Sequence, residues 1–266
     1  MKLKWNLNAD SIEKTKKRKG IGKMEHVIRP LLVSKLGLDK SLMTYFHNFG
    51  ESIMIPVVCW YINAEGKDIL IDTGASKEAI DTFWPGGSQH VQTFEEALAK
   101  LEKTPEDIDI IIATHLHFDH IANAQKCKNA KVIVQEKELN FAYSPHALFA
   151  GIYSKALYSD LKFKTVNGEQ EIVDGIKVVP APGHTPGTQA VCIETVKGLA
   201  VISGFCCQNA NFEVPEEMKD HWPLFTPGIH TNATQAFDSA LKIKGLADIL
   251  IPQHEPVFAE ADRIPF

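Results

Sequence analysis

The sequence predicts an α/β fold in which two β-sheets are covered by helices. Residues 53–62 and 108–114 are apolar and rich in β-branched side chains, which indicates buried strands. Residues 94–101 and 231–244 instead carry apolar side chains at helical spacing. Strands separated partly by turns and partly by helices are typical of layered α/β domains. Several strands lead directly into histidine-containing loops, where rigid elements can present side chains for chemistry.

The remaining elements follow the same alternation. A capped turn with Pro105 at its first helical position is expected at residues 104–107. No internal repeat or low-complexity linker divides the chain, so residues 1–266 are expected to form a single domain. Residues 1–50 have the weakest pattern and are expected to be an N-terminal extension packed on that domain. Further strands are expected at residues 69–71, 131–134, 176–180, 190–195, 199–203 and 249–252.

Composition and charge exclude several classes of protein. A net charge of −5 provides no general attraction to nucleic acid or to an anionic membrane. No apolar run approaches the roughly 20 residues needed to span a bilayer. The first twenty residues lack the apolar centre of a signal peptide, and the five cysteines form no regular framework. We therefore expect a cytoplasmic protein with reduced thiols.

Four side chains that commonly bind metals lie within six consecutive residues. They are His115, His117, Asp119 and His120, and they follow directly after the expected strand at residues 108–114. Three histidines buried in one loop are hard to explain as packing, because each ring has two nitrogens that need partners. Imidazole and carboxylate together suit divalent ions such as zinc, manganese or iron. The loop is therefore predicted to bind metal.

Two more histidines follow strands in the same manner. His184 lies in a turn that holds it between glycine and proline residues, after the strand at residues 176–180. His254 follows the strand at residues 249–252. Three strand ends thus supply candidate metal ligands.

Together these segments resemble the metallo-β-lactamase superfamily. The resemblance rests on the HxHxDH motif, on the Gly-His-Thr-x-Gly turn around His184, and on the final strand that ends in a histidine. It implies a four-layer αββα sandwich that holds two divalent metal ions. The turn at Asp72 matches an early aspartate turn of the family, which supports the metal loop. The resemblance assigns one metal to His115, His117 and His184, and the other to Asp119, His120 and His254.

Within the superfamily, residues 42–257 resemble the N-acyl homoserine lactonase-like branch. That branch implies opening of a small cyclic ester by attack of a metal-bound hydroxide. Asp119 would then pass a proton to the leaving group. Zinc is the expected metal, with manganese or iron as alternatives. A cyclic amide or imide hydrolase and a thioester hydrolase like glyoxalase II are alternative activities. A descendant that only binds its ligand is a further alternative.

One departure from this branch concerns the turn after the strand at residues 199–203. The branch places a metal-bridging aspartate there, whereas this chain has Phe205, which cannot bind a metal. Either the second metal is held more weakly or a cysteine thiolate replaces the carboxylate. Cys206 is the candidate ligand because it is nearest, and Cys207 is the alternative because it would share a strand face with Phe205. Otherwise both cysteines are small buried residues.

A tyrosine that polarises the substrate carbonyl in this branch is also missing. Gln208 or Asn209 occupies its expected neighbourhood. This departure weakens the case for acyl homoserine lactones as substrates and leaves carbonyl hydrolysis unaffected.

The expected partner is a small-molecule substrate, with neither nucleic acid nor membrane. Four aromatic residues would either line its pocket or pack in the core or at an interface: Trp84, Trp222, Phe149 and Tyr153. Residues 143–158 are rich in aromatic side chains and would either form a lid over the site or pack against a second subunit in a homodimer.

Overall fold

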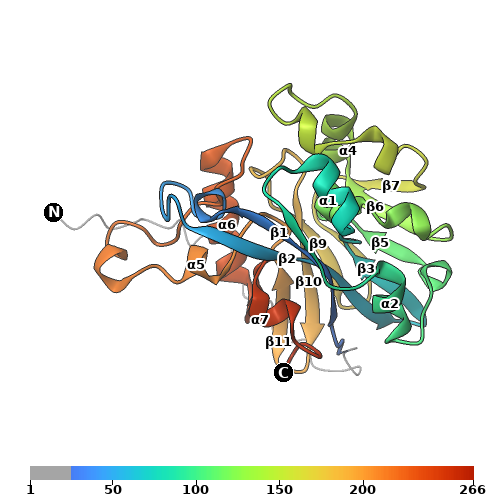
Figure 1. Cartoon of the computed structure of the whole chain (residues 1–266). Helices are drawn as coiled ribbons and strands as arrows, with labels where there is room; N and C mark the ends of the chain where they lie inside the picture. Colours follow the sequence, from blue (N-terminus) through green and yellow to red (C-terminus); the bar gives the residue numbers. More distant parts are fainter. Residues whose placement is uncertain (1–24) are drawn as a thin grey trace.

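Two β-sheets packed face to face occupy the centre of the computed structural model, which describes residues 25–266 (Figure 1). The strands of the first sheet are β1 (Arg29–Asp39), β2 (Ser52–Ala64), β3 (Lys67–Ile71), β4 (Ser88–His90), β5 (Ile110–Ile112), β6 (Lys131–Gln135) and β7 (Phe163–Val166). The strands of the second sheet are β8 (Gln170–Val173), β9 (Ile176–Pro180), β10 (Gln189–Thr195), β11 (Gly198–Ile202) and β12 (Ile249–Ile251). Their spatial orders are β4-β1-β2-β3-β5-β6-β7 and β12-β11-β10-β9-β8.

Helices cover the outer faces of both sheets. The α-helices are α1 (Lys77–Phe83), α2 (Phe94–Ala99), α3 (Phe118–Ile121), α4 (Glu136–Tyr143), α5 (Asn209–Phe212), α6 (Ala233–Leu246) and α7 (Pro256–Ala259). Short 3₁₀ turns are Lys40–Leu42, Pro105–Asp107, Ala124–Lys126, Ala150–Ile152, Lys155–Leu157 and Glu216–Met218. None of the helices in residues 25–266 is long and apolar enough to cross a membrane.

The apolar core between the sheets is built from alternate residues of their strands. Val58, Trp60 and Ile62 of β2 point into it, and Val191 and Ile193 of β10 meet them from the opposite sheet. Successive side chains of a strand point to opposite faces, so the residues between them are free to face the helices. The continuous apolar runs in the sequence reflect burial on both faces of these strands.

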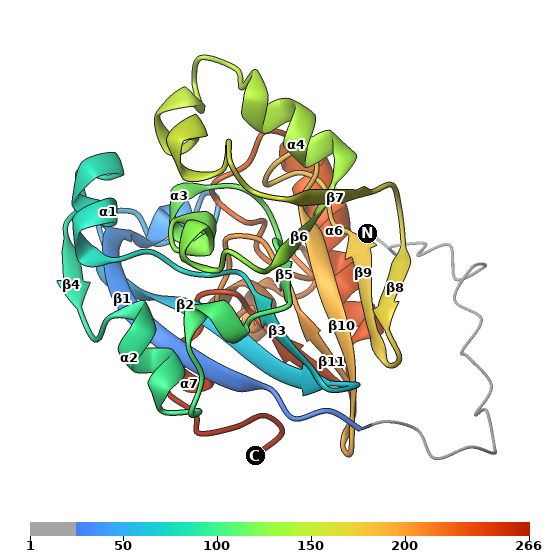
Figure 2. The ribbon, with the colours of Figure 1, turned by 90° about the vertical axis from the view of Figure 1, so that its right-hand side faces the viewer.

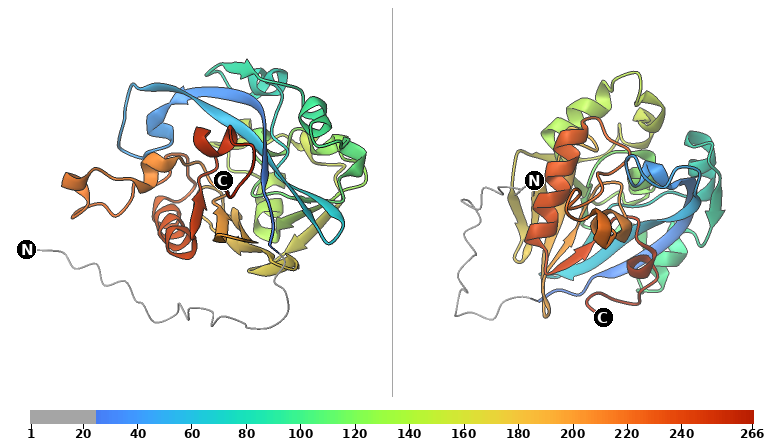
Figure 3. Two further views of the ribbon diagram at one scale, coloured as in Figure 1. Left: turned by 90° about the horizontal axis from the view of Figure 1, so that it is seen from below. Right: turned by 90° about the vertical axis from the view of Figure 1, so that its left-hand side faces the viewer.

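A second core lies between the first sheet and its helices, and a third lies between the second sheet and its helices. Leu70 of the first sheet packs with Leu98 of α2. On the far side, Val201 of the second sheet packs with Ala240 and Ile243 of α6. Figures 1 and 3 show α6 on one flank of the paired sheets and α1, α2 and α4 on the other. The layers are therefore helix, sheet, sheet and helix, as the sequence predicted.

The carboxyl ends of parallel strands from both sheets meet at one edge of the sandwich. β3, β5 and β6 run parallel in the first sheet, and β11 and β12 run parallel in the second. Asp72 follows β3 and His115 follows β5. His184 and His254 follow β9 and β12 of the second sheet. The candidate metal ligands therefore come from short loops at a rigid edge.

The first sheet differs from the sequence prediction in its N-terminal part. Arg29–Asp39 is an integral strand that pairs with β2 on one side and with β4 on the other, so this part of the predicted extension is wrong. The strand was missed because a bulge between Leu32 and Ser34 shifts its register and breaks the period of two. Ile28 also bridges Ile264, which ties the C-terminal segment to the start of β1 (Figure 2). Residues 1–24 of the predicted extension lie outside the described residues.

Candidate metal centre

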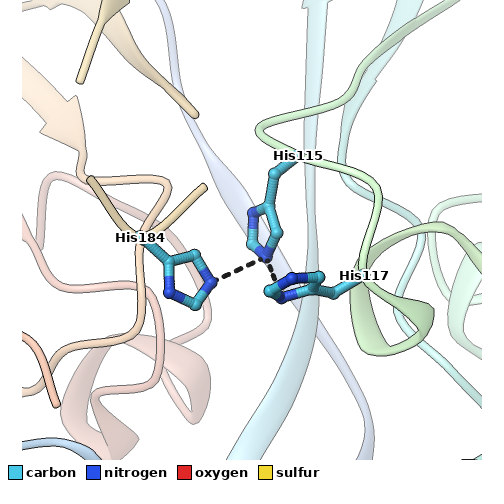
Figure 4. A group of neighbouring side chains, drawn as sticks. All are labelled: His115, His117 and His184. Carbon is cyan, nitrogen blue, oxygen red and sulfur yellow. Dashed lines mark hydrogen bonds between the residues drawn. The ribbon is translucent and has the colours of Figure 1, made fainter. Parts of the chain in front are cut away.

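Three histidine rings from two loops converge on one point. The Nε2 atom of His115 lies 3.1 Å from Nδ1 of His117 and 3.1 Å from Nε2 of His184 (Figure 4). All three side chains are buried. His115 and His117 come from the loop after β5, whereas His184 comes from the turn after β9 in the other sheet.

The outward hydrogen bonds of these rings determine which nitrogens face inward without a proton. Nδ1 of His184 donates to the carbonyl oxygen of Ile229 at 2.6 Å. Nδ1 of His115 lies 3.1 Å from the Thr114 hydroxyl, which itself donates to Asp72 and therefore accepts from the ring. The two Nε2 atoms consequently face each other with their lone pairs. Such an arrangement fits a shared divalent cation, which binds neutral imidazole through that lone pair.

A second group contains Asp119, His120 and His254. Nε2 of His120 lies 3.3 Å from Oδ2 of Asp119, and the ligand atoms of all three residues lie within 4.8 Å of one another. Nδ1 of His254 donates to the carbonyl oxygen of Pro56 at 2.9 Å, so its Nε2 carries a free lone pair. Two imidazole nitrogens and a carboxylate are a common donor set for zinc and similar ions.

Asp72 connects the two groups through hydrogen bonds. Its buried carboxylate accepts from the Thr114 amide and hydroxyl at 2.7 and 2.8 Å, from Nδ1 of His120 at 2.8 Å, and from the Gln253 amide at 2.9 Å. Asp72 also has a φ of 56°, which is uncommon for a residue other than glycine. The Asp72 turn therefore supports the loop that contains His115 and His120, as predicted, and its carboxylate belongs to neither ligand group of the described residues.

Burial and charge determine the protonation of these rings. Burial lowers the pKa of His115 well below its usual value, and it lowers that of His184 to about 4. Burial also favours the neutral form of His120, but the carboxylates of Asp119 and Asp72 outweigh it and raise its pKa to about 10. The first group is therefore neutral. In the second group a proton on His120 balances the carboxylates of Asp119 and Asp72, and a bound cation would take the place of that proton.

Glu138 is a residue of this region that the sequence analysis missed. It lies on α4, is fully buried, and accepts hydrogen bonds from the Leu116 amide, the Tyr153 hydroxyl and the Thr185 hydroxyl, at 2.9, 2.9 and 2.5 Å. It also accepts a bond from the amide of Gly187. Glu138 therefore joins the loop of His115 and His117 to the loop of His184. Its only signal in the sequence is its helical spacing from Ala142, the other buried residue of α4.

The cysteines after β11 lie in two different environments. Phe205 and Cys207 belong to the core beneath α6, and Sγ of Cys207 lies 3.2 Å from the Ser203 hydroxyl. Cys206 instead lines the pocket beside the metal-binding groups, with its Sγ 3.4 Å from the carbonyl oxygen of Leu42. Its sulfur belongs to neither ligand group of the described residues. The assignment of Cys206 as a ligand stays a prediction.

Serine substitutions test that prediction. Because the Cys206 thiol already bonds to a carbonyl oxygen, we expect Cys206→Ser and Cys207→Ser each to keep the metal affinity of the parent chain, as measured by competition with a chelator. A loss of about tenfold or more in Cys206→Ser alone would show that the thiol turns toward Asp119 and acts as a ligand. The same loss in Cys207→Ser alone would identify Cys207 as the ligand instead.

An apolar pocket opens beside the two groups. Its space between side chains is about 410 Å³, and Asp119, with 13% of its side chain exposed, faces it together with the histidines. The side chains that we call the apolar wall are Leu36, Leu38, Met43, Ile55, Trp84, Phe118, Ile152 and Ile229.

The aromatic residues predicted to line a pocket divide between several places. Trp84 does line it, and Ile152 reaches it from the predicted lid at residues 143–158. Tyr153 instead packs its ring edge-on against His117, with centroids 4.7 Å apart. Phe149 packs on the core under the first sheet, and Trp222 is 43% exposed beside a different ring, that of His47.

The fold and the two ligand groups define a class of protein, the metal-dependent hydrolases built on an αββα sandwich. Residues 54–254 match the family described as the metallo-beta-lactamase superfamily. The chain belongs to this superfamily.

Within this superfamily, the chain is similar to several lactonases. An N-acyl homoserine lactonase of Bacillus sp is 31% identical over 193 residues, which cover 67% of this chain and 76% of that protein. A solved quorum-quenching N-acyl homoserine lactone lactonase superposes with a TM-score of 0.72 at 24% identity, covering 90% of this chain and 96% of the other. A dizinc quorum-quenching lactonase in complex with a product superposes with a TM-score of 0.66 at 17% identity, covering 91% of each chain, a likeness that shows the fold alone.

Proposed function

We propose that this chain is a lactone hydrolase that holds two divalent metal ions, one in each ligand group. The observation that carries the proposal is the pair of facing Nε2 lone pairs of His115 and His184, which fit a shared cation and not each other. The lactonase relatives support the lactone as substrate. Zinc is the proposed metal, because imidazole and carboxylate donors suit it and because one structural neighbour is a dizinc lactonase. Manganese and iron fit the same donors.

The residues have separable roles in the proposed reaction. His115, His117 and His184 would hold the first ion, and His120 and His254, with Asp119, would hold the second. When bound, such ions polarise a carbonyl group and lower the pKa of water from about 15.7 to about 7. Asp119 faces the pocket, so its carboxylate can take a proton from the attacking water and pass it to the departing alkoxide.

The overall reaction is the addition of water across one bond. The water oxygen forms a bond to the carbonyl carbon, and the bond from that carbon to the ring oxygen breaks. The electron pair of the broken bond leaves with the ring oxygen, which receives a proton and becomes a hydroxyl group. The product is an open hydroxy acid, which loses its remaining acidic proton to solvent at neutral pH.

Metal analysis followed by a substrate panel tests this proposal. We expect two equivalents of a divalent metal after reconstitution, loss of activity on chelation, and hydrolysis of lactones in preference to cyclic amides and thioesters. A stoichiometry that stays at one or below would contradict the second site. Hydrolysis of lactoylglutathione without hydrolysis of lactones would instead favour a thioester hydrolase like glyoxalase II, and bound metal without any hydrolysis would favour a ligand-binding role.

A cytoplasmic location and a homodimer also stay predictions. Ultracentrifugation of the purified chain would show whether it is a monomer or a homodimer.

A further inference from the structure

The pocket beside the metal-binding groups offers few hydrogen bonds to a substrate. Apart from the candidate ligands, only Trp84 and Cys206 among its lining residues carry a polar side-chain atom. The indole nitrogen of Trp84 already donates to the carbonyl oxygen of Gly37 at 2.8 Å. The thiol of Cys206 likewise donates to the carbonyl oxygen of Leu42. The apolar wall therefore has no side-chain donor or acceptor to spare.

The polar side chains of Gln208 and Tyr153, which adjoin two of the candidate ligands, are also engaged in hydrogen bonds. The side-chain amide of Gln208 donates to the backbone carbonyl of His254 at 3.1 Å. The hydroxyl of Tyr153 donates to Glu138, away from the pocket. Most of the apolar wall also belongs to one continuous hydrophobic cluster that includes Met43, Phe118 and Cys206. Apart from the metal-binding groups and the Trp84 indole, the side chains that a substrate would meet in this pocket carry only hydrocarbon or sulfur.

The geometry points to lactones with plain hydrocarbon substituents, such as γ- and δ-alkyl lactones, as the preferred substrates of this site over lactones that carry an acylamino group. This inference rests on the proposed lactonase function and narrows its substrate class.

The position of an acylamino group on the lactone ring decides whether it meets the apolar wall. In an N-acyl homoserine lactone, the amide nitrogen is attached to the ring carbon next to the carbonyl. A carbonyl that reaches the ligand groups would carry the amide, only two bonds away, into the pocket, where the apolar wall offers it no side-chain partner. An amide that leaves water without finding a partner loses binding energy, whereas an alkyl chain gains it on the same surface.

A matched pair of substrates tests the inference. α-Hexyl-γ-butyrolactone and N-hexanoyl homoserine lactone both carry a six-carbon chain on the ring carbon next to the carbonyl, and only the second has the amide. We expect kcat/KM of the metal-loaded enzyme to favour the hexyl lactone by about 10- to 100-fold, the range over which apolar pockets discriminate. An equal or higher value for the acyl homoserine lactone would overturn the inference while leaving the lactonase function intact. Failure to hydrolyse either lactone would refute the lactonase function itself.

A substitution at the rim of the pocket provides a second test. Ile152 is only half-buried, so Ile152→Asn should fold and would place an amide group where the apolar wall has none. We expect this variant to shift the ratio of kcat/KM toward N-hexanoyl homoserine lactone by about tenfold. Ile152→Val and the remote, exposed Val196→Asn are the matched controls and should keep the parent ratio. A ratio in Ile152→Asn equal to that of the controls would show that amide recognition does not depend on this wall.

Discussion

Replacing His117 by alanine is expected to remove hydrolytic activity and one equivalent of metal. His117 supplies one of only three nitrogens in the first group, with its Nδ1 3.1 Å from Nε2 of His115. Two remaining imidazoles cannot hold a divalent ion in the same open site, so the activation of water is lost. The expected fall in kcat/KM is about three orders of magnitude or more, since the loss of even one stabilising donor costs about 10² to 10³. Steady-state kinetics and elemental analysis measure the two effects.

His146→Ala is the matched control for this experiment. His146 is exposed, and Nδ1 of its ring accepts a local hydrogen bond from the amide of Leu148. Metal content and activity should therefore stay close to those of the parent chain. If the two variants behave alike, the histidines of the loop after β5 are not the metal ligands.

The ligand loops could be predicted from the sequence because their chemistry is local. His115, His117, Asp119 and His120 lie within one short segment, and the strand before them is a clear apolar run. The structure brings these four residues together with His184 and His254 in two groups. The main helix was equally clear, since the pattern at residues 231–244 corresponds to α6.

Features that depend on distant contacts were not visible in the sequence. Arg29–Asp39 becomes a strand because β2 and β4 pair with it on its two sides, and no local pattern records that pairing. Glu138 resembles a surface acid in a charged helix until the loops of Leu116 and Thr185 close over it. The side-chain direction of Cys206 depends on the carbonyl group of Leu42, far away in the sequence.

Replacement of Glu138 is expected to have the second large effect, on stability and on metal affinity. Its Oε1 accepts from the amide of Leu116, which lies between His115 and His117, and its Oε2 accepts from the hydroxyl of Thr185, which follows His184. The backbone amide of Leu116 can only donate. A glutamine in this place has one acceptor oxygen instead of two. If its NH₂ group faces Leu116, that buried amide loses its acceptor, at a cost of about 1–3 kcal/mol in the free energy of unfolding. If the NH₂ group faces Thr185 instead, the Thr185 hydroxyl must accept from it and turn its own proton to the Thr188 hydroxyl, 2.7 Å away, which reverses the bond that ties the loop of His184 to α4.

We therefore expect Glu138→Gln to weaken the first metal site more than the second. Residues that orient metal ligands typically change metal affinity by about 10- to 100-fold when they are replaced. Glu136→Gln is the matched control, because Glu136 lies exposed in the first turn of the same helix. Titration of the metal-free protein with zinc would resolve the two affinities, and thermal unfolding of the same metal-free protein would measure stability separately. Equal weakening of both sites would indicate a general loss of stability. Unchanged zinc affinity in Glu138→Gln would show that the buried carboxylate does not position His115, His117 and His184.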